Sequence, residues 1–246
     1  NKLELNSYEQ KTYDLFINRI NLICKKATKI KTPIFIDAEE SWIQDAIDKI
    51  VLSLMKKYNQ KEVLVYNTLQ MYRNDRIAYL NKTITVAKNE NFKLGFKLVR
   101  GAYHEKEIAR AKKNGYKTPV HLKKEDTDID FNKSLEICMS NIDIVSICSG
   151  THNIESSEYL ISLMKEKGIK NNDKRIFSSQ LLGMSDNISY NLSKEGYNVC
   201  KYVPYGPVRE VIPYLIRRAE ENRSISGQMS RELQNIISER KRRKRA

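Results

Sequence analysis

The chain has 246 residues, 40% of them hydrophobic, which is enough to bury the core of one sizeable domain. No run approaches the roughly 20 consecutive apolar residues of a membrane-spanning helix, and no segment resembles a signal peptide. The four cysteines are scattered, which excludes a disulfide framework or zinc motif based on Cys-x-x-Cys spacing and indicates a reducing compartment. We expect one soluble domain spanning residues 1–246.

The formal net charge of +14 would suit an anionic partner such as nucleic acid or anionic lipid. Lysines are spread along the whole chain, however, and only residues 240–245 form a dense basic run. We therefore expect no nucleic-acid partner. We interpret residues from about 234 to 246 as a basic, solvated C-terminal tail.

Short apolar runs alternate with longer amphipathic segments, which is the pattern of parallel βαβ units. Continuous apolar runs suit strands that are buried on both faces. The predicted strands are residues 33–37, 62–66, 95–99, 144–149, 175–179 and 199–203. The predicted helices are residues 9–27, 42–58, 73–90, 131–139, 156–167 and 185–195, with another after Gly206-Pro207.

Polar or small residues follow the predicted strands. They include Asp37 to Glu40, Asn67 to Gln70, Arg100 to Tyr103, Thr151 to Asn153, Gln180 and Tyr202. In a parallel barrel the carboxyl ends of the strands converge on the face that carries the active site. An open doubly wound sheet would also gather chemistry there, but neither G-x-G-x-x-G after the first strand nor a P-loop motif is present. We therefore predict a (βα)8-type barrel.

The last predicted helix presents a possible anion site. Four of its side chains share one face at i, i+3, i+4 and i+7: Tyr214, Arg217, Arg218 and Glu221. Two guanidinium groups can bind a carboxylate bidentately, although a solvated face with an Arg217–Glu221 pair fits the same spacing. The neighbouring apolar stripe, expected to pack on the barrel, is Val208, Val211, Ile212, Leu215 and Ala219.

Other chemistries receive less support. The three histidines do not share a helix turn or strand face, so we expect no metal site. No G-x-S-x-G elbow indicates covalent hydrolysis. Asp37, Glu39 and Glu40 suit either acid–base work or capping of a helix N-terminus, and Asp37 is the one we expect to point into the barrel. The residues alone thus indicate a barrel enzyme that binds an anionic group of unspecified kind.

Seven segments, in a shared order between residues 35 and 222, resemble the proline dehydrogenase family. They are FIDAEE at 35–40, YNTLQMY at 66–72, KLVRGAY at 97–103, GTHN at 150–153, QLLGM at 180–184, YVPYG at 202–206 and YLIRRAEEN at 214–222. The resemblance implies a distorted (βα)8 barrel that holds FAD at the carboxyl ends of its strands. It also implies oxidation of L-proline to 1-pyrroline-5-carboxylate by hydride transfer to flavin N5, with electrons passed to a membrane quinone.

The resemblance assigns a substrate site. Arg217 and Arg218 match the pair that grips the substrate carboxylate, and Glu221 matches a carboxylate near the substrate amine. The residues that match the walls around the pyrrolidine ring are Ala102, Tyr103, Leu181, Tyr202 and Tyr214. Relatives that prefer hydroxyproline carry a smaller residue at the position of Tyr202, so its bulk favours proline. Asp37 is expected to orient the site by hydrogen bonding, and it joins Tyr202, Arg217 and Arg218 in the expected catalytic set.

The resemblance also assigns a cofactor site. The positions that match FAD contacts are Gln70, Lys97, Val99, Arg100, Gly101, Lys124, Thr151, His152 and Asn153. Small residues let the backbone approach a cofactor closely, and cations suit the pyrophosphate and the reduced flavin.

Relatives carry one more strand upstream of Asp37, so we expect this chain to lack the first strand of the barrel. The implied location is cytoplasmic, or peripheral to the inner membrane on the mitochondrial matrix face, with the basic surface approaching anionic lipid. Two rivals remain at this point. One is a basic, non-catalytic barrel that binds an acidic partner, and the other is a phosphate-handling barrel that uses the same arginines.

Overall fold

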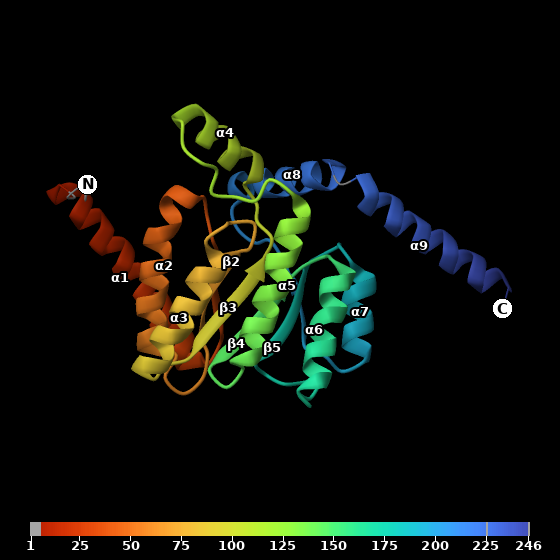
Figure 1. Ribbon diagram of the computed structural model, residues 1–246, viewed down its shortest axis with the longest axis horizontal. Helices are drawn as coiled ribbons and strands as arrows, with labels where there is room; N and C mark the ends of the chain where they lie inside the picture. The colour runs from red at the N-terminus through yellow and green to blue at the C-terminus, as the bar shows by residue number, and fades with distance from the viewer. Residues whose placement is uncertain (1–5, 225, 246) are drawn as a thin grey trace.

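The computed structural model describes residues 6–224 and 226–245, with the backbone alone at residues 217–224, 226–232, 234, 235 and 245. Within these residues six parallel strands form one sheet in the order β1 to β6, and at least one helix separates each strand from the next (Figure 1). The strands are β1 Ile34–Ile36, β2 Val65–Gln70, β3 Leu94–Val99, β4 Val145–Gly150, β5 Ile176–Leu181 and β6 Val199–Tyr202.

The helices flank this sheet and extend beyond its carboxyl end. They are α1 Ser7–Ile30, α2 Ser41–Tyr58, α3 Arg76–Glu90, α4 His104–Asn114, α5 Lys124–Ser140, α6 Ile154–Glu166, α7 Asp186–Lys194, α8 Val208–Ser224 and α9 Ser226–Arg245. α1 begins with a capping box in which Asn6 and Glu9 bond reciprocally at 2.9 Å. α4 and α8 lie at the end of the sheet where the strands finish (Figure 1).

The alternation predicted from the sequence is confirmed, and the sheet is the curled, parallel arrangement of a barrel. All residues of β2 are buried, as are the first five of β4, because helices cover one face of the sheet and the curl encloses the other. Leu69, Phe96 and Ile147 belong to the core that the strands share with the helices. The strand order leaves β1 and β6 as the two edges of the described sheet.

Two boundary predictions were wrong. The second strand was predicted at residues 62–66 with the polar stretch 67–70 beyond it, but that stretch completes β2 and is buried. Its polar side chains are tolerated there because they are hydrogen-bonded; Asn67, for example, donates to Asp48 Oδ1 at 2.9 Å. The helix α4 was not predicted, and α5 begins at Lys124, well before the predicted residue 131.

The expected packing of the apolar stripe of α8 is also contradicted. Val208 is 71% exposed, Ile212 47% and Leu215 46%. The helix crosses the carboxyl end of the sheet instead of lying along its helix-covered flank (Figure 1). Val211 is the described member of the stripe that is half-buried. The side chain of Ala219 lies outside the described residues. The basic run that we interpreted as a tail belongs to α9, where residues 240–244 are exposed.

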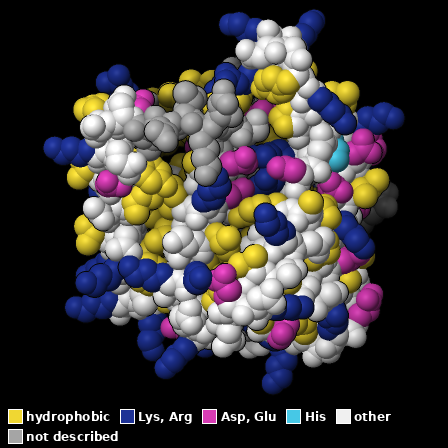
Figure 2. All heavy atoms as spheres, turned by 60° about the vertical axis from the view of Figure 1, so that its left-hand side comes forward, with side chains coloured by type: hydrophobic (Ala, Val, Ile, Leu, Met, Phe, Trp, Pro, Cys, Tyr) yellow, Lys and Arg dark blue, Asp and Glu magenta, His cyan; other side chains and the backbone are white. Residues whose placement is uncertain are grey.

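The positive charge is dispersed on the face seen in Figure 2, where Lys and Arg side chains stand around the outline and between hydrophobic groups. Among the helices that the structure describes, none is both long enough and apolar enough to cross a membrane.

Candidate functional site

An ion pair joins two of the predicted site residues at the carboxyl ends of β1 and β3. Lys97 projects from β3 and pairs with Asp37, which follows β1. Thr68 of β2 donates a 3.4 Å hydrogen bond to the same carboxylate oxygen, Oδ1. The ammonium of Lys97 also lies 5.7 Å from the centre of the Phe35 ring. The Asp37 carboxylate therefore fixes the partly enclosed ammonium of Lys97 near the carboxyl end of the sheet.

Gln70 connects two loops beside this ion pair. Its side chain is almost completely buried at the end of β2. Its Nε2 donates to the carbonyl of Glu39 at 2.8 Å, and its Oε1 accepts from the backbone N–H of Ala102 at 3.0 Å. A single amide thus fixes the loop after β1 against the loop after β3.

The loop after β3 requires glycine at position 101. Gly101 has φ +142°, and a Cβ there would lie 2.5 Å from the ring of Tyr72. Burial raises the pKa of the Tyr72 phenol, and the charge of Glu107 raises it further. The backbone at Gly101 therefore packs directly against the buried, neutral ring of Tyr72, with no room for a Cβ between them.

Arg100 joins three elements through its guanidinium. Its Nε donates to Asp128 at 2.5 Å, Nη1 to Thr151 Oγ1 at 2.6 Å and Nη2 to Ser156 Oγ at 3.0 Å. Burial tends to raise the pKa of Asp128, but hydrogen bonds from Lys124 and Arg100 outweigh it and hold that pKa below its usual value. Lys124, at the start of α5, pairs with the same carboxylate at 2.6 Å.

The segment after β4 leads directly into α6. Asn153 is the N-cap residue, and its side chain accepts from the N–H of Ser156 at 2.8 Å. Thr151 Oγ1 accepts from the N–H of Asn153 at 3.1 Å, so the same hydroxyl contacts both this turn and Arg100. His152 Nδ1 lies 3.0 Å from Ser185 Oγ.

Val99 is the last residue of β3, and its carbonyl accepts from the N–H of Met71 at 2.8 Å.

Aromatic residues lie at the β6 end of the carboxyl edge. The rings of Tyr202 and Tyr214 are 5.8 Å apart in an edge-to-face arrangement. Leu181 is the register partner of Tyr202 on β5. At the opposite end of the edge, the hydroxyl of Tyr103 donates to Glu39 Oε2 at 2.6 Å. Tyr202 and Tyr214 therefore meet, whereas Tyr103 is held near β1.

The backbone of α8 carries the predicted anion clamp. Arg217, Arg218 and Glu221 lie within this helix, but their side chains lie outside the described residues. Their roles remain predictions.

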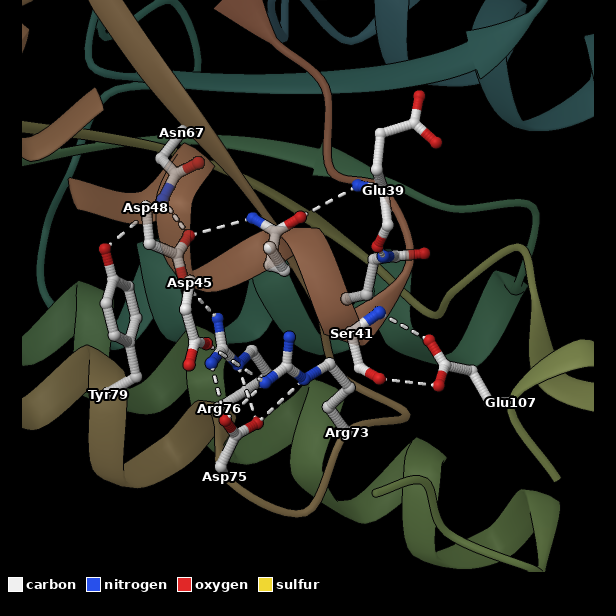
Figure 3. Close-up of polar contacts among 12 residues, drawn as sticks. Glu39, Ser41, Asp45, Asp48, Asn67, Arg73, Asp75, Arg76, Tyr79 and Glu107 are labelled. Carbon is white, nitrogen blue, oxygen red and sulfur yellow. Dashed lines mark hydrogen bonds and ion pairs between the residues drawn. The ribbon is translucent and has the colours of Figure 1, made fainter. Parts of the chain in front are cut away.

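A buried polar network that the sequence did not reveal supports the loop after β1 (Figure 3). Gln44 accepts from the N–H of Glu39 and donates to Asp48, each at 2.8 Å. Asp48 also pairs with Arg76 at 2.6 Å, although both side chains are almost completely buried. Nothing in the spacing of these residues distinguishes them from the polar face of a solvated helix, so only the fold identifies them.

A second buried contact comes from α4. Glu107 is fully buried and accepts from the N–H and the hydroxyl of Ser41 at 2.6 and 2.7 Å (Figure 3). Glu40, the N-cap residue of α2, makes no capping hydrogen bond of its own. Glu107 therefore caps α2 from a different helix.

Chemically, this edge offers fixed cations, amide and hydroxyl groups, and an aromatic pair. Among the described residues there is no cluster of three or more histidine, cysteine or acidic side chains suited to a metal ion.

Parallel strands with intervening helices and a polar carboxyl edge define an α/β protein of the barrel class. The sequence model of the family described as proline dehydrogenase matches residues 2–231. The chain belongs to the proline dehydrogenase family.

Curated relatives agree with this assignment. The chain is 39% identical to proline dehydrogenase 1, mitochondrial, of Drosophila melanogaster, covering 96% of this chain and 36% of the relative. The human protein of the same name is also 39% identical, with 89% and 37% covered. Hydroxyproline dehydrogenase of Xenopus laevis is 34% identical, with 92% and 50% covered. The chain thus spans half or less of the length of these relatives.

Solved structures share the fold. Proline utilization A from Bdellovibrio bacteriovorus, inactivated by N-propargylglycine, superposes with a TM-score of 0.80 at 19% identity, over 87% of this chain and 22% of that one. A proline utilization A structure with proline bound in remote sites gives 0.77 at 21% identity, over 86% and 22%.

Proposed function

We propose that this chain forms the catalytic barrel of a proline dehydrogenase, which oxidises L-proline to 1-pyrroline-5-carboxylate with FAD as cofactor. The observation that carries the proposal is the gathering of predicted cofactor residues from three neighbouring strands at one edge. Gln70 ends β2, Lys97 lies two residues before the end of β3 and Arg100 follows that strand. Thr151, which follows β4, joins them through its bond to Arg100. Family membership supplies the reaction.

The donor set fits a flavin dinucleotide. FAD carries two phosphates and a ring system that becomes anionic on reduction, and both favour nearby cations. Three cations are available, each held by a carboxylate: Lys97, Arg100 and Lys124. The hydroxyl of Thr151 and the backbone near Gly101 offer neutral contacts. Val99, His152 and Asn153 complete the proposed cofactor site. When bound, FAD supplies the hydride acceptor, flavin N5.

The chain itself binds and orients the substrate. Arg217 and Arg218 bind the carboxylate of proline, and Glu221 lies near its amine. The edge-to-face pair of Tyr202 and Tyr214 forms an apolar wall suited to a five-membered ring. Ala102, Tyr103 and Leu181 complete the proposed substrate site.

Asp37 acts as a positioning residue. It holds the ammonium of Lys97 and accepts a hydrogen bond from Thr68, so it orients the cation without taking a proton from the substrate. Holding reacting groups in place is the main source of catalysis in this scheme.

Electron transfer and location extend the same proposal. We propose a membrane quinone as electron acceptor and the matrix face of the inner mitochondrial membrane as the location, with peripheral contact through basic residues. The mitochondrial names of relatives 39% identical to this chain support the location. Residues 1–246 act as one catalytic unit in this scheme, with the basic residues of α9 extending from it.

Substrate choice provides the test, because one relative is named hydroxyproline dehydrogenase. We expect proline to be preferred, since the Tyr202 ring occupies space that a 4-hydroxyl group needs. Tyr202→Ser should lower kcat/KM for L-proline and raise that for 4-hydroxyproline, narrowing the preference by at least about tenfold. Product formation is followed by trapping the cyclic imine with an aromatic amine. Tyr205→Ser, at a 99% exposed ring, is the control and should leave the preference unchanged.

A preference for 4-hydroxyproline in the unsubstituted chain would contradict the assigned substrate. If neither amino acid is oxidised by FAD-loaded protein, the proposal as a whole fails.

A further inference from the structure

The backbone of Glu39, in the loop after β1, is held on both sides by buried amide side chains. Its N–H donates to Gln44 Oε1 of α2, and its carbonyl accepts from Gln70 Nε2 of β2, each at 2.8 Å. Gln44 is 1% exposed and Gln70 is 3% exposed. Because Gln70 also accepts from the N–H of Ala102, Glu39 connects α2 with the loop after β3.

The direction of the hydrogen bonds at Gln44 is fixed from the α3 side. A guanidinium only donates and a carboxylate only accepts. Arg76 Nη1 donates to Asp48 Oδ2 at 2.6 Å, and Asp48 Oδ1 accepts from Gln44 Nε2 at 2.8 Å (Figure 3). Gln44 must therefore present its Oε1, and not its amide N–H groups, to the N–H of Glu39.

The orientation of Gln70 follows from the position of Glu39. The carbonyl of Glu39 can only accept, so Gln70 directs Nε2 towards it and Oε1 towards the N–H of Ala102. The carboxylate of Glu39 accepts from the hydroxyl of Tyr103 at 2.6 Å, which holds the same loop at a second point. Loss of the Gln44 amide would remove the buried acceptor of the Glu39 N–H and loosen the residue that orients Gln70.

We propose that Gln44 is a positioning residue for the flavin. The inference rests on the proposed function, in which Gln70 belongs to the cofactor site and Ala102 and Tyr103 belong to the substrate site. Gln44 acts through Glu39, which holds Gln70 and the loop after β3 in the orientation that FAD requires. The site is therefore formed before the cofactor binds, which lowers the cost of ordering it on binding.

The chain offers a matched control at the opposite end of β2. Asn59 is a second fully buried amide that holds backbone groups. Its Nδ2 donates to the carbonyl of Val65 at 2.8 Å, and its Oδ1 accepts from the N–H groups of Leu64 and Val65 at 3.0 and 2.9 Å. Val65 is the first residue of β2, whereas Gln70 is the last. Asn59→Leu should therefore lower stability without changing the carboxyl edge.

The first experiment measures FAD binding to the full chain by quenching of flavin fluorescence, with Gln44→Met and Asn59→Leu as the compared variants. Gln44→Met should weaken binding at least about tenfold, because an unsatisfied buried donor costs enough to change an equilibrium by that factor. It should also shift the visible bands of the flavin that still binds. Asn59→Leu should leave both the affinity and the bands unchanged, although urea denaturation shows a comparable loss of stability.

The outcomes separate this inference from the proposed function. If the unsubstituted chain binds FAD and Gln44→Met binds it with equal affinity and an unchanged spectrum, the positioning role of Gln44 is wrong and the proposed function stands. If the unsubstituted chain takes up no FAD, both are overturned.

A second measurement needs no substitution. Amide hydrogen exchange is read at single residues of the unsubstituted chain, first without FAD and then with it. The amides of Glu39 and Ala102 should already exchange at least about 100-fold more slowly than in an unfolded chain before FAD is added. Exchange at the unfolded rate, or protection that arises only after FAD is added, would show that the site is not held in advance and would overturn the proposal.

Discussion

Gly101 illustrates how a single residue determines the path of the loop after β3. Gly101→Ala introduces both an unfavourable φ and a Cβ within 2.5 Å of the Tyr72 ring. Gly115→Ala introduces only the backbone strain, because Gly115 has φ +69° and no atom within 4 Å of the added Cβ. We expect Gly101→Ala to lower the free energy of unfolding by about 1 to 3 kcal/mol more than Gly115→Ala does. Urea denaturation measures both, and equal losses would contradict the close approach.

Asp75 gives a pH-dependent prediction. Burial tends to raise its pKa, but hydrogen bonds and charges from Arg76 and Arg73 outweigh it and hold the pKa below the usual value. A carboxylate with a lowered folded pKa stabilises the protein above its unfolded pKa of about 3.9 and loses that effect as pH falls through the folded value.

Asp75→Asn should therefore destabilise the protein at pH 7, and its difference from the unsubstituted chain should shrink below about pH 4. Urea denaturation at pH 7, 5 and 3 gives the comparison. Asp14→Asn, on the exposed face of α1, serves as a control. A difference for Asp75→Asn that grows towards pH 3 would show that the arginines do not stabilise its charged form.

Several residues at the carboxyl edge could be anticipated from the sequence because polar groups after buried strands converge in a parallel sheet. The partners of these residues could not. Asp37 was expected to orient the site, but its pairing with Lys97 depends on how the strands curl. Gln44 and Asp48 looked like ordinary solvated helix residues, and their burial depends on the loop that packs over them.

At the scale of elements, α4 supports α2 through one carboxylate. Glu107→Ala removes the acceptor of two hydrogen bonds from Ser41 and leaves the start of α2 uncapped. We expect a loss of about 2 to 3 kcal/mol in the free energy of unfolding and faster hydrogen exchange at the Ser41 amide. Glu105→Ala, at an exposed position of the same helix, should cost less than about 0.5 kcal/mol. Similar losses for the two variants would argue against inter-helix capping.

The elements that the sequence predicted best are those with a clear apolar period. α2, α6 and α7 were placed within two residues of their observed ends, because each buries one apolar face. α4 was missed because only Glu107 and Ala111 of that helix are buried, so it carries no apolar stripe. The apolar stripe of α8 led to the opposite error, because it predicted packing on the barrel at positions that are exposed. An apolar face alone does not show what covers it.

At the scale of the whole molecule, the alternation of strands and helices was sufficient to predict a parallel α/β sheet of the barrel class. Successive strands are neighbours in a (βα)8 barrel, and the observed order β1 to β6 agrees with that prediction. The sequence did not predict which strands form the edges of the sheet. The strand pairing in the structure shows that β1 and β6 are the edges of the described sheet. The carboxyl edge nevertheless brings residues from β1 to β6 to one side of the molecule, where a cofactor and a small substrate could meet.

The central claim is that this edge holds FAD and delivers a hydride to it from L-proline. The most direct test is the visible absorption spectrum of the FAD-loaded protein, recorded anaerobically before and after addition of L-proline. We predict a bound flavin whose absorption bleaches on addition of L-proline and not of D-proline. A protein that takes up no FAD, or a bound flavin that remains oxidised with L-proline, would contradict the account.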